Sequence, residues 1–373
     1  MKIKILHTAD NHIGMKFSGY PDAARETLVA ERLAALENIV NAGNEGESHF
    51  LVIAGDLFDS VNVRLADLKA VAGILHKFQG EAVLILPGNH DFYESSADSL
   101  WEKFKKLIKP EKIQVLSEYK KEVYQIGEQK VAFYPCSCRS KHSPENAIGW
   151  VSSEAKDETV LNIGIAHGNV DGLGLDNADR YFNMAPGELK SAALDFWLLG
   201  HIHVPYPSTS VDENPVFFMS GTHTPDGWDR KHEGYCFGID VEENKKVAAR
   251  LIPTGNIRFY DWEREIHSDI DIEKLMAEIK SLNGNKSVVR IALSGRLAAT
   301  VLQQFRASLE LLKKEFLHLA FYDSMKEDIN EEFINAHYPK NSFPQLLLSS
   351  LLSESDEGLS IQLANDLIET NKK

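Results

Sequence analysis

Residues 50–59, Phe-Leu-Val-Ile-Ala-Gly-Asp-Leu-Phe-Asp, join five consecutive apolar residues to a short acidic motif. A run of this kind predicts a buried strand over Phe50 to Ala54, because strands covered on both faces are apolar throughout. Similar runs predict strands at Lys2 to His7, Ala82 to Leu86, Val160 to Ala166 and Phe196 to Leu199. Residues 23–41 and 65–78 carry apolar side chains at helical spacing. This alternation predicts a layered α/β fold.

Each of these five strands is followed by a short polar motif. In chain order the motifs are Asp10-Asn11-His12, Gly55-Asp56-Leu57-Phe58-Asp59, Gly88-Asn89-His90-Asp91, His167-Gly168 and Gly200-His201-Ile202-His203. Any one of them alone could be a turn or a strand end with core histidines. In α/β sheets, however, ligands gather beyond the carboxyl ends of the strands. Five such motifs in this order therefore indicate the ligand set of a two-metal phosphoesterase.

The motifs supply seven candidate metal ligands, which are Asp10, His12, Asp56, Asn89, His167, His201 and His203. Asp56 is the natural bridging ligand, because it is the one acidic ligand with no histidine beside it. Two divalent cations lower the pKa of a bound water and neutralise charge on phosphoryl oxygens. Carboxylate, amide and imidazole donors together favour manganese, with iron or zinc as alternatives.

Two residues beside these ligands are candidates for the catalytic chemistry. His90 follows Asn89 directly, and we expect it to face the substrate and to protonate or stabilise the leaving oxygen. Asp59 lies three residues after Asp56 and is placed to orient His90. His223 follows the apolar run 216–219 and is a candidate to line the cleft, whereas the remaining histidines show no such arrangement.

The composition limits the classes of partner. With a formal net charge of -15 over 373 residues, the chain has no general basic coat, so any contact with DNA must be local. Loop residues that could meet backbone phosphates, or simply be solvated, are Lys16, Arg64, Arg139, Lys141 and His142.

The three cysteines are too few for a disulfide framework, which indicates a reducing compartment. Cys136 and Cys138 lack the further ligands of a structural zinc site. No apolar run has the length of a signal-peptide core or of a membrane span. We therefore expect a cytoplasmic protein without a membrane partner.

The length of the chain predicts more than one domain. We place a phosphoesterase domain at residues 1–262, a small α/β domain at 263–325 and C-terminal helices at 326–373. The small domain has expected strands at 265–267, 287–294 and 316–322 and helices at 272–282 and 298–314. The segments 343–352 and 359–368 are expected helices with one apolar face, which either packs onto its own domain or docks a partner helix or coiled coil.

The motifs resemble the calcineurin-like metallophosphoesterase superfamily, and residues 7–14, 55–59 and 199–203 are similar to those of SbcD-type DNA repair nucleases. The resemblance implies two packed sheets flanked by helices, with a smaller C-terminal α/β capping domain that helps to place DNA. It implies that His90 is the catalytic histidine. It also implies one manganese held by Asp10, His12, Asp56 and His203 and a second held by Asp56, Asn89, His167 and His201. Beyond residue 263 the sequence is more similar to the YhaO-type bacterial relatives.

The leading prediction is a manganese-dependent DNA phosphodiesterase, acting as exonuclease and structure-specific endonuclease through a hydroxide that bridges the metals. The resemblance implies that it is the nuclease subunit of a DNA repair and recombination complex with an SMC-like coiled-coil ATPase, and a homodimer is a further expected assembly. One alternative is a small-molecule phosphoesterase acting on cyclic nucleotides or nucleotide derivatives; another is a scaffold subunit that organises the ATPase. A protein phosphatase is less favoured, because Ser60 rather than arginine follows Asp59.

Overall fold

The computed structural model describes residues 2–173, 181–209, 214–354 and 359–371. It divides into two compact units, Met1–Phe259 and Tyr260–Lys373. The first unit holds all the motifs at strand ends.

The first unit is built around two sheets. The six-stranded sheet has the order β11-β10-β1-β2-β3-β4. Its strands β1 to β4 run parallel, and β10 is antiparallel to both of its neighbours, β1 and β11. Its strands are β1 (Ile3–Thr8), β2 (Phe50–Ala54), β3 (Ala82–Leu86), β4 (Ile113–Val115), β10 (Tyr235–Val241) and β11 (Val247–Pro253). Because β1, β2 and β3 are parallel, their carboxyl ends lie at one edge of this sheet.

The five-stranded sheet has the order β5-β6-β7-β8-β9, with β6 to β9 parallel and β5 antiparallel to β6. Its strands are β5 (Glu122–Ile126), β6 (Gln129–Cys136), β7 (Leu161–His167), β8 (Phe196–Gly200) and β9 (Phe217–Met219). The expected strands that end near residues 166 and 199 therefore correspond to β7 and β8, each one residue longer at its carboxyl end.

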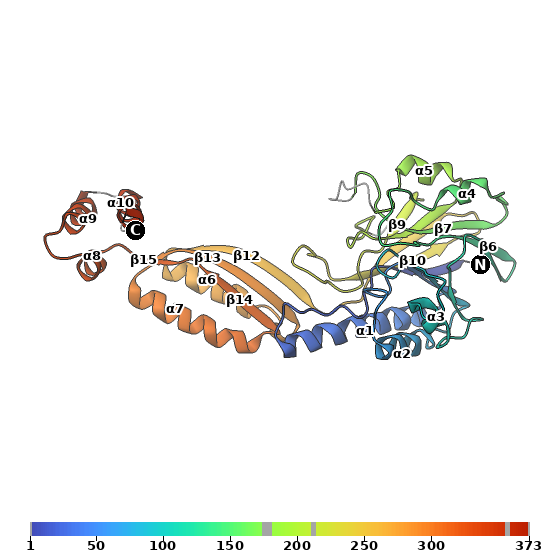
Figure 1. Cartoon of the computed structure of the whole chain (residues 1–373), viewed down its shortest axis with the longest axis horizontal. Helices are drawn as coiled ribbons and strands as arrows, with labels where there is room; N and C mark the ends of the chain where they lie inside the picture. The colour runs from blue at the N-terminus through green and yellow to red at the C-terminus, as the bar shows by residue number, and fades with distance from the viewer. Residues whose placement is uncertain (1, 174–180, 210–213, 355–358, 372–373) are drawn as a thin grey trace. The chain divides into compact units, whose positions relative to one another are not determined.

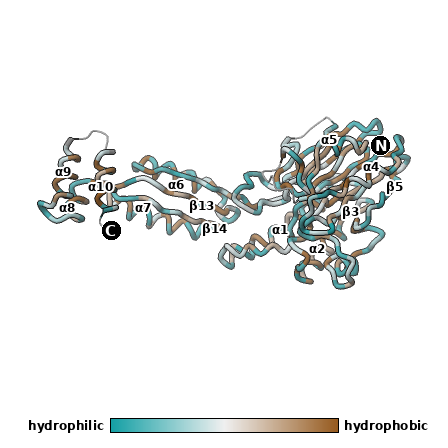
Figure 2. The backbone as a smooth tube through the Cα atoms, turned by 45° about the horizontal axis from the view of Figure 1, so that its top comes forward, coloured by the Kyte–Doolittle hydropathy of each residue, from teal (hydrophilic) through white to brown (hydrophobic). Residues whose placement is uncertain are grey.

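Buried apolar side chains hold four layers together. Phe50 and Val52 of one sheet meet Phe133, Ile163 and Phe218 of the other in a shared core. Helices α1 (Asp22–Glu45), α2 (Leu65–Leu75) and α3 (Leu100–Lys105) cover the outer face of the six-stranded sheet, while α4 (Gly149–Ser153) and α5 (Pro186–Ser191) cover the other sheet (Figure 1). Figure 2 shows hydrophobic residues, in brown, along the strands that lie between these helices. The predicted fold class, two packed sheets flanked by helices, is confirmed.

The second unit begins with a small α/β layer pair. Strands β12 (Arg258–Ile266), β13 (Ser287–Leu297) and β14 (His318–Asp323) form a sheet in that order, and β15 (Lys326–Glu327) pairs with β13. Helices α6 (Asp269–Lys280) and α7 (Ala299–Leu312) pack on this sheet around Leu275, Ile279 and Phe305. Short 3-10 turns occupy Gly284–Lys286 and Lys313–Glu315. The sequence predicted only 265–267 for the first strand, which was too short.

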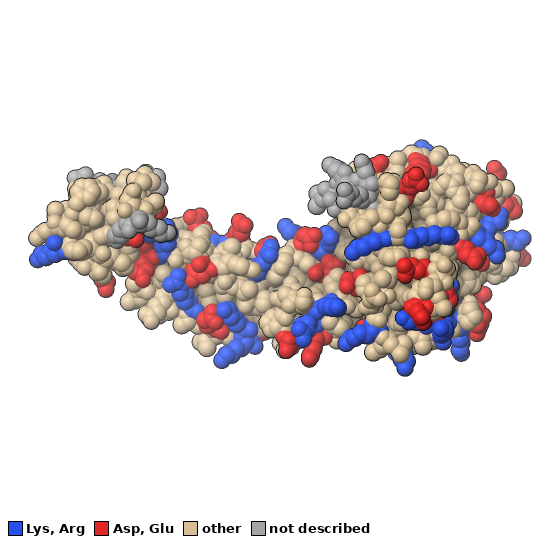
Figure 3. Space-filling view, viewed as in Figure 1, with Lys and Arg blue, Asp and Glu red and all other residues tan. Residues whose placement is uncertain are grey.

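Three helices complete the second unit. They are α8 (Glu331–His337), α9 (Phe343–Glu354) and α10 (Leu359–Asn371). Ile334, Tyr338, Leu348 and Ile361 form a small core of their own among these helices. Among the described residues, no helix combines the length and apolar character needed to cross a bilayer. On the face shown in Figure 3, Lys and Arg side chains are interspersed with Asp and Glu.

Candidate metal centre

The turns that follow β1 and β2 run side by side. The main-chain N–H of Asp10 donates to the carbonyl of Gly55 at 3.1 Å, and that of His12 donates to the carbonyl of Asp56 at 2.9 Å. Asn89 follows β3, His167 ends β7 and His201 follows β8. All seven predicted ligands therefore meet where the carboxyl ends of the two sheets come together.

Asp56 lies between two sets of donor atoms. Its Oδ2 is 3.7 Å from Nε2 of His12 and 3.3 Å from Nε2 of His167. Its other oxygen, Oδ1, accepts the main-chain N–H of His90 at 2.8 Å, which fixes the orientation of the carboxylate. One oxygen of Asp56 thus faces imidazoles from both sheets, as the prediction of a bridging ligand requires.

The first donor group consists of Asp10, His12, Asp56 and His203. The Nε2 atoms of His12 and His203 are 3.2 Å apart, and ligand atoms of Asp10, His12 and His203 all lie within 4.8 Å of one another. Both Asp10 oxygens accept the main-chain N–H of His201, at 2.9 and 3.1 Å. Asp10, His12 and Asp56 are buried, whereas His203 is partly exposed.

The second donor group consists of Asp56, Asn89, His167 and His201. Oδ1 of Asn89 lies 2.9 Å from Nε2 of His167 and 3.1 Å from Nδ1 of His201. Nδ1 of His167 lies 2.9 Å from the carbonyl of Ala54. Because a carbonyl can only accept, Nδ1 of this imidazole carries a proton, and Nε2 faces oxygens of Asn89 and Asp56.

Lone pairs that converge in a buried place repel one another unless a proton or a metal cation lies between them, and a metal cation takes the place of such protons when it binds. Both donor groups have this character, since Nε2 of His167 faces oxygens of Asn89 and Asp56, and two Nε2 atoms face each other across 3.2 Å. Carboxylate, amide and imidazole ligands suit divalent transition metals. The residues present therefore fit two divalent cations that share Asp56.

Four of these residues have left-handed backbone conformations. Their φ angles are 54° at Asp10, 43° at His12, 52° at Asp56 and 101° at His201. Non-glycine residues rarely adopt such angles, which cost about 1–3 kcal/mol each and cluster at functional sites. The turns that carry the donor atoms are thus held in strained shapes by the packing around them.

Electrostatic interactions within the cluster shift the imidazole pKa values in opposite directions. Burial lowers the pKa of His167, but the charge of Asp56 outweighs burial and raises it to about 9. Burial, together with the charge on His167, lowers the pKa of His201 to about 3. Burial also lowers the pKa of His203, yet its contact with Asp226 gives a net rise. The buried carboxylates therefore decide which rings carry a proton.

His90 is oriented by a different atom from the one predicted. Its Nδ1 donates to the main-chain carbonyl of Asp59 at 3.1 Å, whereas the Asp59 carboxylate lies 3.5 Å from Nδ1 of His12. The reason is the main-chain N–H of Asp59, which donates to the carbonyl of Ile13 and holds this segment alongside the turn that carries His12. The His90 ring, partly exposed, stands edge-on to that of His12 at 4.8 Å.

Several residues that support the donor atoms were not predicted from the sequence. Arg32 of α1 is buried and donates to the carbonyls of Asn11 and Asp10, at 2.7 and 3.3 Å. Oδ2 of Asp226 lies 2.8 Å from Nδ1 of His203. The buried Asp91 carboxylate accepts the main-chain N–H groups of Phe58 and Gly88, which ties the second and third motifs together. Asp91 belongs to one of the five polar motifs, but no local signal marks Arg32 or Asp226.

Two histidines are placed differently from the expectation. His223 is fully buried, and its Nε2 donates to the carbonyl of Arg32 at 2.8 Å, so it does not line a cleft. His232, which seemed ordinary in the sequence, has its Nε2 2.7 Å from the carbonyl of His203 and supports that turn. The three cysteines are free and buried.

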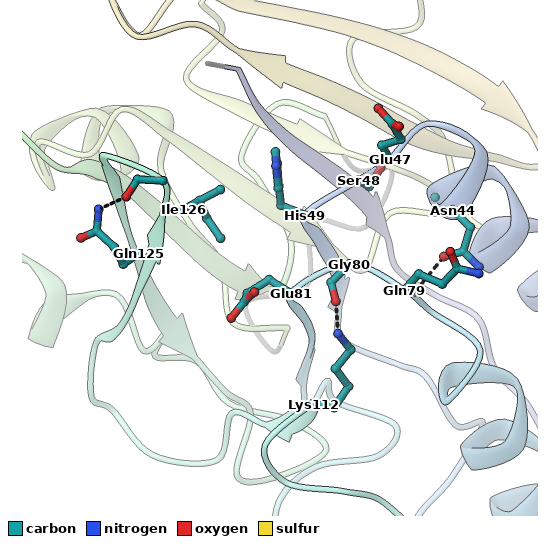
Figure 4. A pocket seen from close by; sticks show the side chains of 12 residues that line it. Asn44, Glu47, Ser48, His49, Gln79, Gly80, Glu81, Lys112, Gln125 and Ile126 are labelled. Atoms are coloured by element: carbon teal, nitrogen blue, oxygen red, sulfur yellow. Dashed lines mark hydrogen bonds between the residues drawn. The ribbon is translucent and has the colours of Figure 1, made fainter.

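Other hollows of the first unit lie apart from the donor groups. A cavity of about 480 Å³ lies at the amino ends of β2 and β3, where His49 and Glu81 line it together with Lys112, whose Nζ donates to the carbonyl of Gly80 (Figure 4). A second cavity, of about 720 Å³, is lined by Lys16, Arg25 and Arg64 and by apolar residues of α1. Its lining includes Gly14, Met15 and Lys16, which directly follow the motif that contains His12.

The fold and the converging ligands define a phosphoesterase of the dinuclear-metal class. Residues 3–205 match the calcineurin-like phosphoesterase family, and because this is more than half of the chain, the chain belongs to that family. The matched range includes all seven ligand residues together with His90 and Asp59, but not Asp226. Membership of this family accounts for the metal-ligand residues that the structure brings together.

One curated relative is the uncharacterized metallophosphoesterase YhaO of Bacillus subtilis, 24% identical over 212 residues, which are 54% of this chain and 48% of the relative. The chain thus spans about half the length of that relative. Among solved structures, TT1561 of Thermus thermophilus aligns with a TM-score of 0.40 and 13% identity over 67% of this chain and 99% of its own. YfcE of E. coli, described as a phosphoesterase, aligns with a TM-score of 0.26 and 11% identity over 68% and 100%.

Proposed function

We propose that this phosphoesterase is a DNA phosphodiesterase of the SbcD type, with exonuclease and structure-specific endonuclease action. The observation that carries the proposal is the position of Asp56 Oδ2 between imidazoles of the two donor groups, with His90 beside them. When bound, two divalent cations supply an activated water and neutralise charge on the phosphate oxygens. We propose manganese as the native metal.

His90 is the residue that we assign to the leaving group. Its Nδ1 proton is committed to the Asp59 carbonyl, so Nε2 is the atom free to hold or give a proton. The ring is partly exposed, whereas Asp10, Asp56 and Asn89 are buried. In this arrangement His90 Nε2 protonates or stabilises the oxygen that departs from phosphorus.

An aromatic ring at the rim supports a nucleotide substrate. Tyr181 is partly exposed, and its ring lies 5.3 Å from that of His201 with a tilt of 34° and 5.3 Å from the edge-on ring of His142. Stacking on an aromatic side chain contributes about 1–3 kcal/mol per base and accepts any base. A phosphodiester near the donor groups could therefore place a neighbouring base against Tyr181.

A small-molecule phosphoesterase that acts on cyclic nucleotides is the second candidate. It is favoured by the pairing of basic side chains beside the 720 Å³ cavity, since Arg64 binds Asp67 at 2.9 Å and Arg25 binds Asp22 at 3.0 Å. Charges already neutralised in this way contribute little to binding a long phosphate backbone.

We also propose that α9 and α10 dock an SMC-like coiled-coil ATPase in a DNA repair complex. These helices bury Leu348 and Ile361 among themselves, yet they expose four large apolar side chains, at 55–74% of their surface: Phe343, Leu346, Leu363 and Leu367. Exposed apolar side chains grouped on helices are typical of docking faces. A double substitution, Phe343→Glu with Leu367→Glu, should abolish co-elution with the purified ATPase. Dimerisation of the chain alone through this face, with no ATPase bound, would overturn the assignment.

The substrate is tested with a panel. The purified chain with manganese is incubated with single-stranded DNA, a hairpin-ended duplex and cyclic nucleotides, and the Asp56→Asn variant serves as the metal-site control. We expect cleavage of both DNA substrates by the wild type and of neither by the variant. Hydrolysis of cyclic nucleotides alone would overturn the nuclease proposal in favour of the second candidate. Replacing manganese with zinc or iron in the same assay tests the choice of metal.

A further inference from the structure

We propose that Asp226 is a positioning residue which, through His203, makes the first donor group bind its cation more tightly than the second. This inference rests on the metal ligation in the proposed function, not on DNA as the substrate. Asp226 lies outside the range matched by the family.

The contact between Asp226 and His203 is close and shielded. Oδ2 of Asp226 lies 2.8 Å from Nδ1 of His203, and only 8% of the Asp226 side chain is exposed. A carboxylate facing Nδ1 favours the tautomer with its proton on that nitrogen. The lone pair on Nε2 of His203 is then turned toward Nε2 of His12, 3.2 Å away.

His12 has a related arrangement, because Oδ1 of Asp59 lies 3.5 Å from its Nδ1. Both imidazoles of the first donor group are therefore backed by carboxylates. In the second donor group, Nδ1 of His167 faces the neutral carbonyl of Ala54, and Nδ1 of His201 faces the neutral amide oxygen of Asn89. Carboxylates behind an imidazole raise its basicity and its strength as a metal ligand.

The direct ligands differ in the same sense. We assign two carboxylates to the first donor group, Asp10 and the shared Asp56, and one to the second, which has the neutral amide of Asn89 as its other oxygen ligand. The Asp10 carboxylate lies within 4.8 Å of ligand atoms of both His12 and His167, so its charge also reaches the second group. A dication is attracted more strongly where more carboxylates contact it.

Neighbouring charges moderate this difference without removing it. Arg32 lies near the first group, but its side chain donates to carbonyls and to a hydroxyl rather than to a carboxylate. Arg230 lies 3.8 Å from Asp226 and pairs more closely with Asp229, at 2.9 Å. Asp91 lies near the second group, yet both its oxygens accept main-chain N–H groups.

The test measures manganese binding to the full chain by titration calorimetry, with the bound metal counted by elemental analysis. We expect the wild type to bind two ions in two resolved steps. Asp226→Asn should weaken the tight step roughly 10–100-fold, the range for removing such a supporting carboxylate, and leave the weak step unchanged. Asp229→Asn is the matched control, because it removes an exposed carboxylate that also pairs with Arg230 and should leave both steps unchanged.

A second pair of variants tests whether Asp226 acts through His203. In a His203→Gln background, adding Asp226→Asn should cause no further loss of manganese affinity. The inference would be overturned if Asp226→Asn lowered the manganese affinity further in the His203→Gln background. It would also be overturned if Asp226→Asn alone weakened both binding steps equally, or if the wild type bound its two ions with equal affinity. Thermal unfolding of each variant with chelator present checks that it is folded. DNA is absent from these measurements, so failure of the nuclease assay with two resolved metal steps would refute only the substrate proposal.

Discussion

Gly88 packs directly against Asp56, so a methyl group added at this position tests whether Asp56 serves both donor groups. A Cβ atom at Gly88 would lie 2.2 Å from Oδ1 of Asp56 and 2.4 Å from its main-chain nitrogen. Relief of these contacts requires the two segments to move apart by about 1 Å, and a dense interior resists such movement. Because a preorganised site tolerates only about 0.5 Å, Gly88→Ala should displace the shared ligand.

The cost to stability follows from the same clash. Overpacking of this kind costs about 1–3 kcal/mol. In a folding unit of this size each kcal/mol lowers Tm by about 2–4 °C, which gives a fall of about 2–12 °C. Gly73→Ala is the matched control, because Gly73 lies in α2 and a Cβ added there would meet no atom within 4 Å. That change should stabilise the chain by about 0.4–1 kcal/mol.

The assay compares the two alanine variants with the wild type. Calorimetric unfolding in the presence of chelator gives the change in Tm without metal, and manganese titration gives the affinity of each step. Gly88→Ala should weaken both metal steps, because both donor groups use Asp56. Wild-type affinity at either step would refute the reasoning, since a displaced Asp56 could not then be a ligand of that group.

Three further predictions concern the site and the core. His90→Asn should lower turnover about 10²–10⁴-fold with manganese content unchanged, and loss of metal by elemental analysis would make His90 a ligand instead. Dialysis against chelator should abolish hydrolysis and lower Tm, because an ion at 100 times its Kd stabilises the folded state by about 2.7 kcal/mol, and manganese should restore both. Burial lowers the pKa of His7 to about 3, so the unfolded chain binds the proton first and stability falls between about pH 6.5 and 3. Urea titrations of the metal-free protein give the free energy of unfolding at each pH. Between pH 7 and 4.5 this free energy should fall by about 2–3 kcal/mol less in His7→Gln than in the wild type.

The full bounds of β2 and β3 could be predicted from the sequence, whereas those of β12, which is exposed on one face, could not. The predicted bounds Phe50–Ala54 and Ala82–Leu86 are those of β2 and β3, since every residue in them is buried and apolar. The strand predicted at 265–267 is β12, Arg258–Ile266. Its exposed acidic residues, Asp261, Glu263 and Glu265, interrupt the apolar run that would have marked it.

The convergence of the candidate ligands could be predicted for a related reason. Each follows a recognisable strand, and the ends of parallel strands meet at one edge. What lies behind a ligand depends on packing between segments that have no common pattern. The carboxylate of Asp59 was expected to orient His90. Instead, the main-chain N–H of Asp59 donates to the carbonyl of Ile13, and the Asp59 carboxylate lies beside His12. Asp226 lies 23 residues beyond His203, outside any strand or helix, so no spacing rule connects the two.

Arg32 shows why local motifs are not enough to define this site. In the sequence it is one charged residue in an amphipathic helix, where solvent exposure is the ordinary expectation. In the structure it is buried and binds the carbonyls of Asp10 and Asn11. Those carbonyls belong to a turn strained at Asp10 and His12, and hydrogen bonds from a charged donor, at about 1.5–3 kcal/mol each, are of the size needed to offset that strain. Helix α1 thus supports the turn that carries candidate metal ligands as well as covering the sheet, and only the tertiary fold establishes that.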